Sequence, residues 1–358
     1  MDRSGQVGHP RSSSLPVEPV VRAMNARQRF LETVRRGRPD RIPYYDWEVR
    51  EDVLEQWYEQ GMPRGMTAKE YFAFDRWEVL GHHEDVPLVL DSLPRFEGEL
   101  RGAADFERLK RCYDPTTPGR YPDDWPAHVT RWREREHVLG IVVWEGFLES
   151  LAVGDWRSLA NLLYHFHDAP DLVEDAAAHL TDFAIATIER AADEVEFDFA
   201  MLYEPCASNH APVFSPQHLR RFMLANYRRL TAFLRAKGID LVIVWTQGAV
   251  GPMTPVWVEG GINGLWVCSA AAGGVDYAEL RRRYGPDLVL LGGIDARALY
   301  EDRAAIDRAL AHVPALLAQG AYIPMADERV RCGVPFANYR YYREQIRKLA
   351  GQTGRTKP

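Results

Sequence analysis

The chain has 358 residues, of which 46% are hydrophobic and 11% aromatic, and its formal net charge is −7. This composition supports a large buried core, and the length fits a single barrel of alternating strands and helices. The negative charge disfavours nucleic acid and anionic membranes as partners. No apolar run approaches the roughly 20 residues of a membrane helix. The four cysteines show no CxxC spacing, so we expect a cytoplasmic protein without a disulfide framework.

The first part of the chain reads as a polar tail followed by short elements. Residues 1–23 lack the basic start, apolar stretch and cleavage site of a secretory signal, and we expect a disordered tail. An apolar stripe predicts a helix over 25–36, and further helical patterns fall at 51–60 and 67–74. Short apolar runs at 42–47 and 86–90 are candidate strands. The stretch 82–126 is rich in Pro, Gly and Asp and is either an elaborated loop or a small subdomain.

From residue 138 the pattern becomes regular, because continuous apolar runs alternate with amphipathic helices. Strands are predicted at 138–144, 197–203, 241–245, 262–267, 288–293 and 321–325. Helices are predicted at 156–195 with a break at "HDAPD", at 215–236, near 252–259, and at 276–284, 303–318 and 335–350. Such a rhythm indicates parallel strands buried on both faces. We expect one (β/α)8 TIM barrel over residues 24–350 and a short tail at 351–358, with a doubly wound open sheet as the alternative.

Chemistry-bearing side chains follow the predicted strands. In a parallel barrel the C-terminal ends of all strands share one rim, so these residues are expected to line one pocket. A carboxyl group at a buried strand end has a raised pKa, and Glu204 is therefore our choice for the general acid or base. An ion pair is the competing interpretation of Glu204. Catalytic roles are predicted for Glu204, Asp46 and Asp327. Substrate-binding roles are predicted for Trp47, Glu48, Arg50, Trp144, Glu145, Tyr203, Trp245, Gln247, Cys268 and Arg329.

Four stretches carry a resemblance to a known family: "RQRFLETVRRGRPDRIPYYDWE", "FSPQHLRRFMLANYRRLTAFLRAKGIDLVIVWTQG", "AAGGVDYAELRRRYGPDLVLLGGID" and "GAYIPMADERVRCGVPFANYRYYREQIRKL". They resemble the uroporphyrinogen decarboxylase superfamily over about Met24 to Leu349. The resemblance implies a TIM barrel that often forms a homodimer. It also implies one of two chemistries: cofactor-free decarboxylation of porphyrinogen acetates, or methyl transfer with corrinoid proteins or thiols.

Two departures from the family pattern limit which activity is expected. The decarboxylases carry an Arg-Gln-Ala-Gly-Arg block after the first strand, whereas this chain reads "YYDWEVRED". These acidic residues would repel a substrate with eight carboxylates. In the methyltransferase branch a zinc-binding His and Cys fall on Trp245 and Gln247 here, so the family's zinc site is not expected. Trp245 then either stacks against a flat substrate or fills space in the core.

We therefore expect a decarboxylase-like carbon–carbon lyase that acts on a small planar or aromatic acid without a cofactor or metal. A methyltransferase lacking the standard zinc site is the first alternative, and a non-catalytic binding descendant is the second. A rebuilt metal site from Cys206, Cys268, Cys332 and His210 stays open. The expected partners are a small-molecule substrate and a second copy of the chain.

Overall fold

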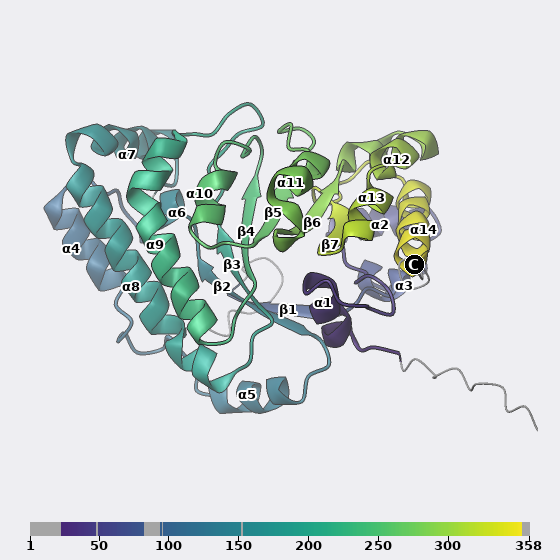
Figure 1. The fold of residues 1–358 in the computed structure, drawn as a ribbon, viewed down its shortest axis with the longest axis horizontal. Coiled ribbons are helices and arrows are strands. Elements are labelled where there is room, and N and C mark those ends of the chain that lie inside the picture. Colours follow the sequence, from purple (N-terminus) through teal and green to yellow (C-terminus); the bar gives the residue numbers. More distant parts are fainter. Residues whose placement is uncertain (1–22, 48, 82–93, 95, 152, 353–358) are drawn as a thin grey trace, which may run out of the picture.

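A seven-stranded parallel sheet organises the fold in the computed structural model, which describes residues 23–352 apart from 48, 82–93, 95 and 152. The strands are hydrogen-bonded in chain order from the first to the seventh, so each neighbours the next (Figure 1). Their bounds are β1 Trp77–Leu80, β2 Val138–Trp144, β3 Phe199–Tyr203, β4 Val242–Gln247, β5 Gly264–Cys268, β6 Val289–Ile294 and β7 Tyr322–Ala326.

Helices precede the sheet and connect its strands. Those before and after β1 are α1 Ala26–Val34, α2 Glu51–Glu59, α3 Ala68–Phe72, α4 Ala103–Cys112 and α5 Trp125–Arg133. Those after β2, β3 and β4 are α6 Phe147–Ser150, α7 Trp156–Asp168, α8 Pro170–Glu194, α9 Pro216–Ala236 and α10 Thr254–Glu259. The remaining ones are α11 Tyr277–Tyr284, the 3-10 turns Gly285–Asp287 and Ala296–Tyr300, α12 Arg303–Leu310, α13 Val313–Gln319 and α14 Phe336–Gln352.

The sheet curls into a half-barrel, and a contact between distant strands demonstrates the curl. The indole rings of Trp77 in β1 and Trp266 in β5 have centroids 5.4 Å apart. In a flat sheet, four strand spacings of about 4.8 Å would separate these strands by roughly 19 Å. The two rings therefore lie on the concave face, and the helices cover the convex face (Figure 1).

Aromatic side chains fill the concave face. Phe199 of β3 packs on Trp77 with ring centroids 6.2 Å apart, and Tyr45 stacks on Trp77 at 4.9 Å. Trp47 contacts Trp266 at 4.8 Å. Because the strand residues come from β1, β3 and β5, the packing follows the layering by alternate strands that is typical of β/α barrels.

The predicted strand at 42–47 forms no ladder with a described strand, so the described residues show seven parallel strands in a half-barrel and do not confirm the full eight-stranded barrel. The segment still contacts both edges of the sheet, because Tyr45 stacks on Trp77 of β1 and Trp47 Nε1 donates to the Ala326 carbonyl of β7 at 2.9 Å. Pro43 has no N–H to donate to a ladder. The backbone N–H of Tyr44 donates to the Asp75 carboxylate at 2.7 Å rather than to a strand. The other early candidate, 86–90, lies outside the described residues.

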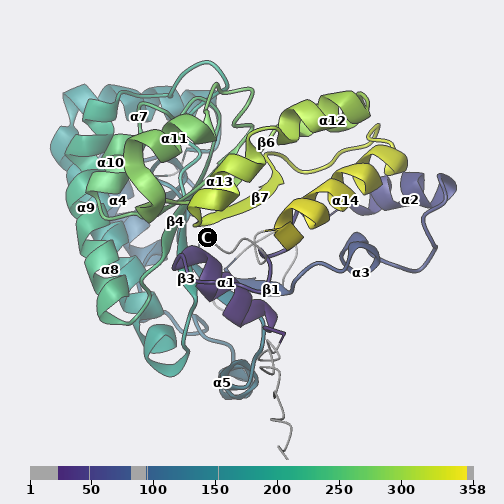
Figure 2. The same ribbon diagram turned by 45° about the vertical axis from the view of Figure 1, so that its right-hand side comes forward.

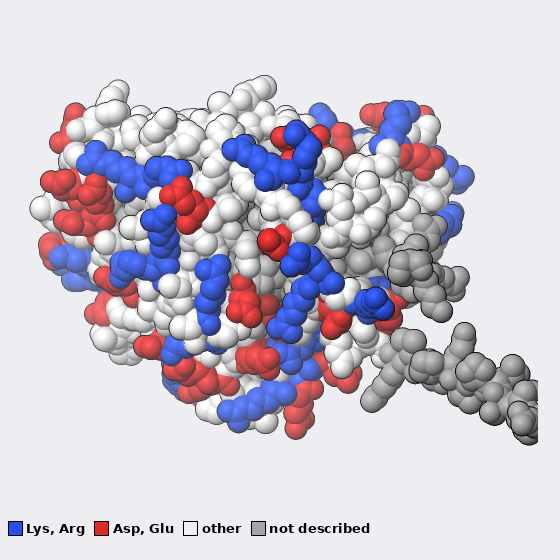
Figure 3. Space-filling model, in the orientation of Figure 1, with Lys and Arg blue, Asp and Glu red and all other residues white. Residues whose placement is uncertain are grey.

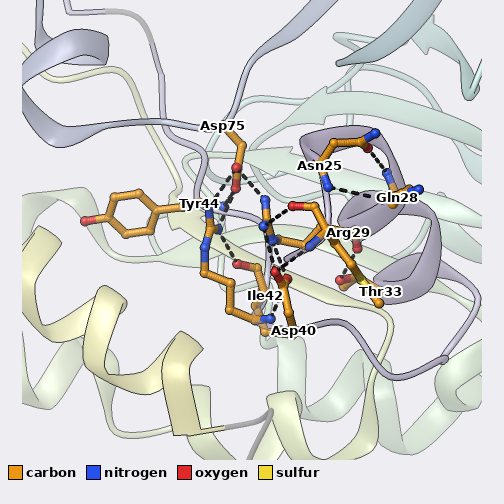
Figure 4. Close-up of polar contacts among 10 residues, drawn as sticks. Asn25, Gln28, Arg29, Thr33, Asp40, Ile42, Tyr44 and Asp75 are labelled. Carbon is orange, nitrogen blue, oxygen red and sulfur yellow. Dashed lines mark hydrogen bonds and ion pairs between the residues drawn. The ribbon is translucent and has the colours of Figure 1, made fainter. Parts of the chain in front are cut away.

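A buried polar network ties α1 to the segment that leads into β1 (Figure 4). Arg29 Nε donates to Asp40 Oδ1 at 2.7 Å, and its Nη1 donates to Asp75 Oδ1 at 2.8 Å. Asp75 also accepts from Arg41 and from the Tyr44 backbone. The network fixes the start of the 42–47 segment next to β1, although these residues do not form a paired strand.

From α7 onward the helical layer largely follows the sequence pattern, whereas α4, α5 and α6 were not predicted. The predicted break at "HDAPD" is confirmed, since α7 ends at Asp168 and α8 begins at Pro170. The single helix predicted over 303–318 is wrong, because the chain forms α12 and α13, the second with Pro314 in its first turn. α14 ends at Gln352 rather than at residue 350 and lies beside α2 and α3 in both ribbon views (Figure 2). The predicted tail at 1–23 lies almost entirely outside the described residues.

The outer surface of α8, α9 and α10 carries both charge signs in alternation (Figure 3). Arg221 pairs with Glu174 of α8 at 2.7 Å, and Arg228 pairs with Glu259 of α10 at 2.9 Å. Interspersed pairs of this kind are typical of a solvated surface. Within the described residues, no helix is long and apolar enough to cross a membrane.

Candidate active site

The C-terminal ends of the strands present two different surfaces, one on the concave face and one under the helices. Tyr203 is in register with Trp245, and Trp245 is in register with Trp266. Paired residues of parallel strands point to the same side of a sheet, and every second residue returns to that side. Tyr203, Trp245 and Trp266 therefore share the concave face, and Gln247 and Cys268 follow them two residues later.

These side chains form what we call the concave rim: Trp47, Tyr203, Trp245, Gln247 and Cys268. The rings of Tyr203 and Trp245 meet edge to face, with centroids 5.0 Å apart and planes at 68°. Both are half-buried, Gln247 is exposed, and Cys268, its register partner on β5, is buried. The rim thus offers a partly accessible aromatic surface of the kind that stacks against flat ligands.

A cationic group lies beside this aromatic surface. The guanidinium carbon of Arg329 lies 6.0 Å from the ring centroid of Trp47. Trp47 is fixed in turn by its hydrogen bond to the Ala326 carbonyl at the end of β7. A half-buried arginine over an indole ring can form a bidentate pair with the carboxylate of a bound acid.

Glu204 lies on the opposite side of β3, under the helices. Its Oε1 accepts a hydrogen bond from the Tyr227 hydroxyl of α9, and its Oε2 accepts one from the Phe147 backbone N–H at 3.0 Å. The side chain is 1% exposed. Burial raises the pKa of Glu204 to about 7, against the opposing effect of the hydrogen bonds from Tyr227 and Phe147. The raised pKa follows the sequence argument, but the carboxyl faces the helix layer and not the concave rim.

Trp144 also faces the helices, because β2 contains a bulge. The register between β2 and β3 shifts between Val142, which pairs with Met201, and Trp144, which pairs with Leu202. Leu202 precedes Tyr203 and so points to the convex face. Strict alternation from Val142 would have put Trp144 on the concave face; the extra residue of the bulge reverses its direction.

Asp46 is held in a buried ion pair outside the concave face. Its Oδ2 accepts from Arg343 Nη1 at 2.8 Å and from the Tyr339 hydroxyl at 3.2 Å, and its Oδ1 accepts from the Trp47 backbone. The Asp46 and Arg343 side chains are 0% and 1% exposed. Alternation along the extended segment explains this placement, because Tyr45 and Trp47 reach the aromatic cluster and Asp46 points to α14.

Asp327 joins the loops that follow three strands. Its Oδ1 accepts from the Ala296 N–H after β6, and its Oδ2 accepts from the Ala271 N–H after β5, both at 2.9 Å. The Ser269 N–H donates to its carbonyl at 2.7 Å. Burial raises the pKa of Asp327, and the two backbone N–H groups act in the opposite direction. With both oxygens occupied, Asp327 positions the loops at the rim.

The remaining predicted residues lie at different depths. Arg50 is exposed and pairs with Asp52 at 3.2 Å. Glu145 is half-buried directly after Trp144. Glu48 lies outside the described residues. Trp266 was missed by the sequence reasoning, although it stands two residues before Cys268 in one strand and therefore shares its face.

The four residues considered for a rebuilt metal site are dispersed. Cys206 is buried, with burial raising the pKa of its thiol, whereas Cys332 and His210 are exposed. Across the described ranges, no group of three or more His, Cys, Asp or Glu side chains is arranged to hold a metal ion. The described part of the chain therefore supplies no preformed set of three such ligands.

A family model and one solved structure agree with this architecture. The family model for uroporphyrinogen decarboxylase (URO-D) matches residues 85–349. A methyltransferase from Methanosarcina mazei is similar in structure, with a TM-score of 0.55, 15% sequence identity, and coverage of 90% of this chain and 99% of that one. A sugar phosphate isomerase/epimerase from Parabacteroides distasonis has a TM-score of 0.34 and 7% identity over 70% of this chain and 95% of its own. The methyltransferase shows a shared fold, and the family match spans most of the chain. The chain belongs to the uroporphyrinogen decarboxylase family.

Proposed function

We propose that this protein is a carbon–carbon lyase that decarboxylates a small planar or aromatic acid at the concave rim, without an organic cofactor. The observation that carries the proposal is the aromatic rim beside a cation: Tyr203 and Trp245 in contact, and Arg329 over the face of Trp47. A flat ring would stack on the rim, and Arg329 would pair with its carboxylate. We also propose that the protein forms a homodimer, as members of the family often do.

The rim favours the reaction by excluding water. In decarboxylation the bond between carbon and the carboxylate breaks, CO2 leaves, the electron pair passes into the ring system, and the carbon takes up a proton. The aromatic surface excludes water from the neutral CO2 as it forms, whereas the ion pair of Arg329 with the carboxylate stabilises the bound acid and has to break in this step. Arg329 orients the carboxylate and sets which acids are accepted.

The proton requires an acid on the concave side. Glu145 directly follows Trp144, the last residue of β2, and is half-buried at the C-terminal end of the sheet. We assign it the proton donor in this proposal. Glu204 becomes a positioning residue, since its two hydrogen bonds hold the start of α6 and the middle of α9 against the end of β3. Asp327 positions the loops after β5 and β6 in the same way.

The proposal is tested with a panel of planar carboxylic acids, by following CO2 release and the quenching of tryptophan fluorescence. We expect at least one acid to bind and to lose CO2. Arg329→Gln should lose this activity, and Arg331→Gln, which replaces an arginine side chain that is 70% exposed, should keep it. A panel that neither binds nor reacts, or equal activity in both variants, would remove the support for the rim.

Methyl transfer is the second candidate, favoured by the structural similarity to a methyltransferase. Cys268 is a thiol on the concave face and would be the nearby nucleophile. The two reactions are separated by their products, because methyl transfer releases a demethylated donor and no CO2. If acids bind but neither CO2 nor a demethylated donor is formed, the result would favour a non-catalytic binding protein descended from the family.

A further inference from the structure

A small cavity lies between α14, α3 and Tyr44, and no residue of the concave rim lines it. Its volume is about 190 Å³, and it is lined by three arginines, Arg340, Arg343 and Arg347, and by Tyr44, Tyr71 and Phe72. The side chains of Tyr44, α3 and α14 that line this cavity are not part of the concave rim. The cavity therefore needs its own explanation.

The three arginines are gathered on one face of α14. Residues three, four and seven positions apart lie along the same side of an α-helix, which brings Arg340, Arg343 and Arg347 together. Glu344 is the carboxylate that lines the cavity with them, and its Oε1 lies 3.9 Å from Arg340 Nε. Arg347 donates to the Phe72 carbonyl at 2.9 Å and has no carboxylate partner in the described part of the chain. Like charges at this spacing repel unless an anion compensates them.

Arg343 adds an independent observation, because part of its guanidinium is buried and unpaired. Its Nη1 donates to Asp46 at 2.8 Å and to the Tyr45 carbonyl at 2.9 Å. Its Nε and Nη2 are buried and have no hydrogen-bond partner among the described residues. The Tyr44 and Phe74 rings lie 4.0 and 4.5 Å from the guanidinium carbon and hold it in place. Unpaired buried donors of a charged group are costly. In the positions shown they are shielded from solvent, so a ligand in the cavity would reach them only after a side-chain movement.

We propose that this cavity is a binding site for a phosphate group, either inorganic phosphate or the end of a phosphomonoester. A volume of about 190 Å³ holds more than a single water molecule and leaves room for a tetrahedral oxyanion. It is smaller than the roughly 300–1,000 Å³ of sites for larger organic ligands. Glu344 and the Asp46 partner of Arg343 offset part of the charge of the three arginines. The remaining net positive charge attracts an anion, and guanidinium groups can pair with phosphate oxygens in a bidentate manner.

Calorimetric titration of the full chain with sodium phosphate, and separately with phenyl phosphate, tests this site. Arg340→Gln combined with Arg347→Gln removes two of the three arginines and leaves the buried pair of Arg343 with Asp46 intact. Arg282→Gln combined with Arg308→Gln is the matched control, because those side chains are 76% and 71% exposed. Thermal melts of each variant check that it is folded.

We expect saturable binding of one phosphate per chain, a Kd at least tenfold weaker in the Arg340/Arg347 variant, and an unchanged Kd in the control. Tighter binding of phenyl phosphate would identify a phosphomonoester as the ligand, and tighter binding of inorganic phosphate would identify the free ion. No saturable binding by the parent protein up to about 10 mM, ten times a Kd of ~1 mM, overturns the proposal. Equal loss in both double variants also overturns it.

Discussion

Trp77 in β1 and Trp266 in β5 place their rings 5.4 Å apart across the concave face of the sheet. This one contact closes the curl of the half-barrel, because it joins strands that are separated by three others. The ring of Trp47 packs against Trp266 with centroids 4.8 Å apart. The guanidinium of Arg329 lies over the same Trp47 ring. The same aromatic contacts therefore pack the interior and shape the proposed site.

Replacement of Trp266 by Ala should destabilise the fold strongly. The side chain is 3% exposed, and loss of a buried large aromatic ring costs about 3–5 kcal/mol through lost burial and the cavity left behind. Chemical denaturation measures the change in the free energy of unfolding. Trp156→Ala is the control, since Trp156 is 84% exposed and should change stability by about 0.5 kcal/mol or less. Similar losses in both variants would mean that the inner cluster does not support the curl.

Glu204 should make stability depend on pH in a defined window. Its folded pKa of about 7 lies above the ordinary value of 4.5, so the folded state binds more protons than the unfolded state between these pH values. The contribution of Glu204 to the free energy of unfolding is fully present below pH 4.5 and is lost as pH rises to about 7. The loss amounts to about 3 kcal/mol at 1.36 kcal/mol per pKa unit.

Glu204→Gln removes this titration, so its free energy of unfolding should improve relative to the parent protein as pH rises from 5 to 8. Denaturation curves at several pH values provide the measurement. Tyr227→Phe is the companion variant: it removes a hydrogen bond that lowers the pKa of Glu204, and so should shift the window to higher pH. Parallel pH curves for the parent and Glu204→Gln would contradict the buried, protonatable carboxyl.

Asp46 should be needed for stability because it neutralises Arg343 inside the protein. Removing one partner of a buried ion pair leaves the other charge uncompensated and costs about 3–5 kcal/mol. We expect Asp46→Asn to lose stability on this scale in thermal or chemical denaturation. The exposed pair of Arg50 with Asp52 supplies the control, since Asp52→Asn should cost less than about 1 kcal/mol. Comparable effects would show that Asp46 is not the main counter-ion of Arg343.

Trp245 should contribute to substrate binding more than to the chemical step. Its ring is half-buried on the concave face and contacts Tyr203, so Trp245→Ala removes stacking surface and no acid or base. We expect KM for the best acid of the panel to rise about tenfold, a loss of ~1.4 kcal/mol, with kcat changed much less. Steady-state kinetics separate the two constants. A fall in kcat with unchanged KM would place Trp245 in the chemical step.

The sequence predicts β2 to β7 because their apolar runs are continuous, as expected for strands buried on both faces. β1 was missed because Trp77–Leu80 is only four residues long and includes a charged residue, Glu78. The faces of the strand ends were harder to predict. A bulge next to Val142 reverses Trp144, and the helix side of β3 provides Tyr227 as a partner for Glu204. Neither the bulge nor the tertiary partner leaves a local pattern in the sequence.

The central claim is that chemistry takes place on the concave face and not under the helices. Turnover of the best acid by Glu145→Gln and by Glu204→Gln tests this most directly, with thermal melts to show that both variants are folded. The account predicts that Glu145→Gln loses about 10²–10⁴-fold in kcat, as for removal of a general acid, and that Glu204→Gln keeps at least about a tenth of the activity. Loss of turnover in Glu204→Gln with near-normal activity in Glu145→Gln would contradict the account and place the reacting group behind β3.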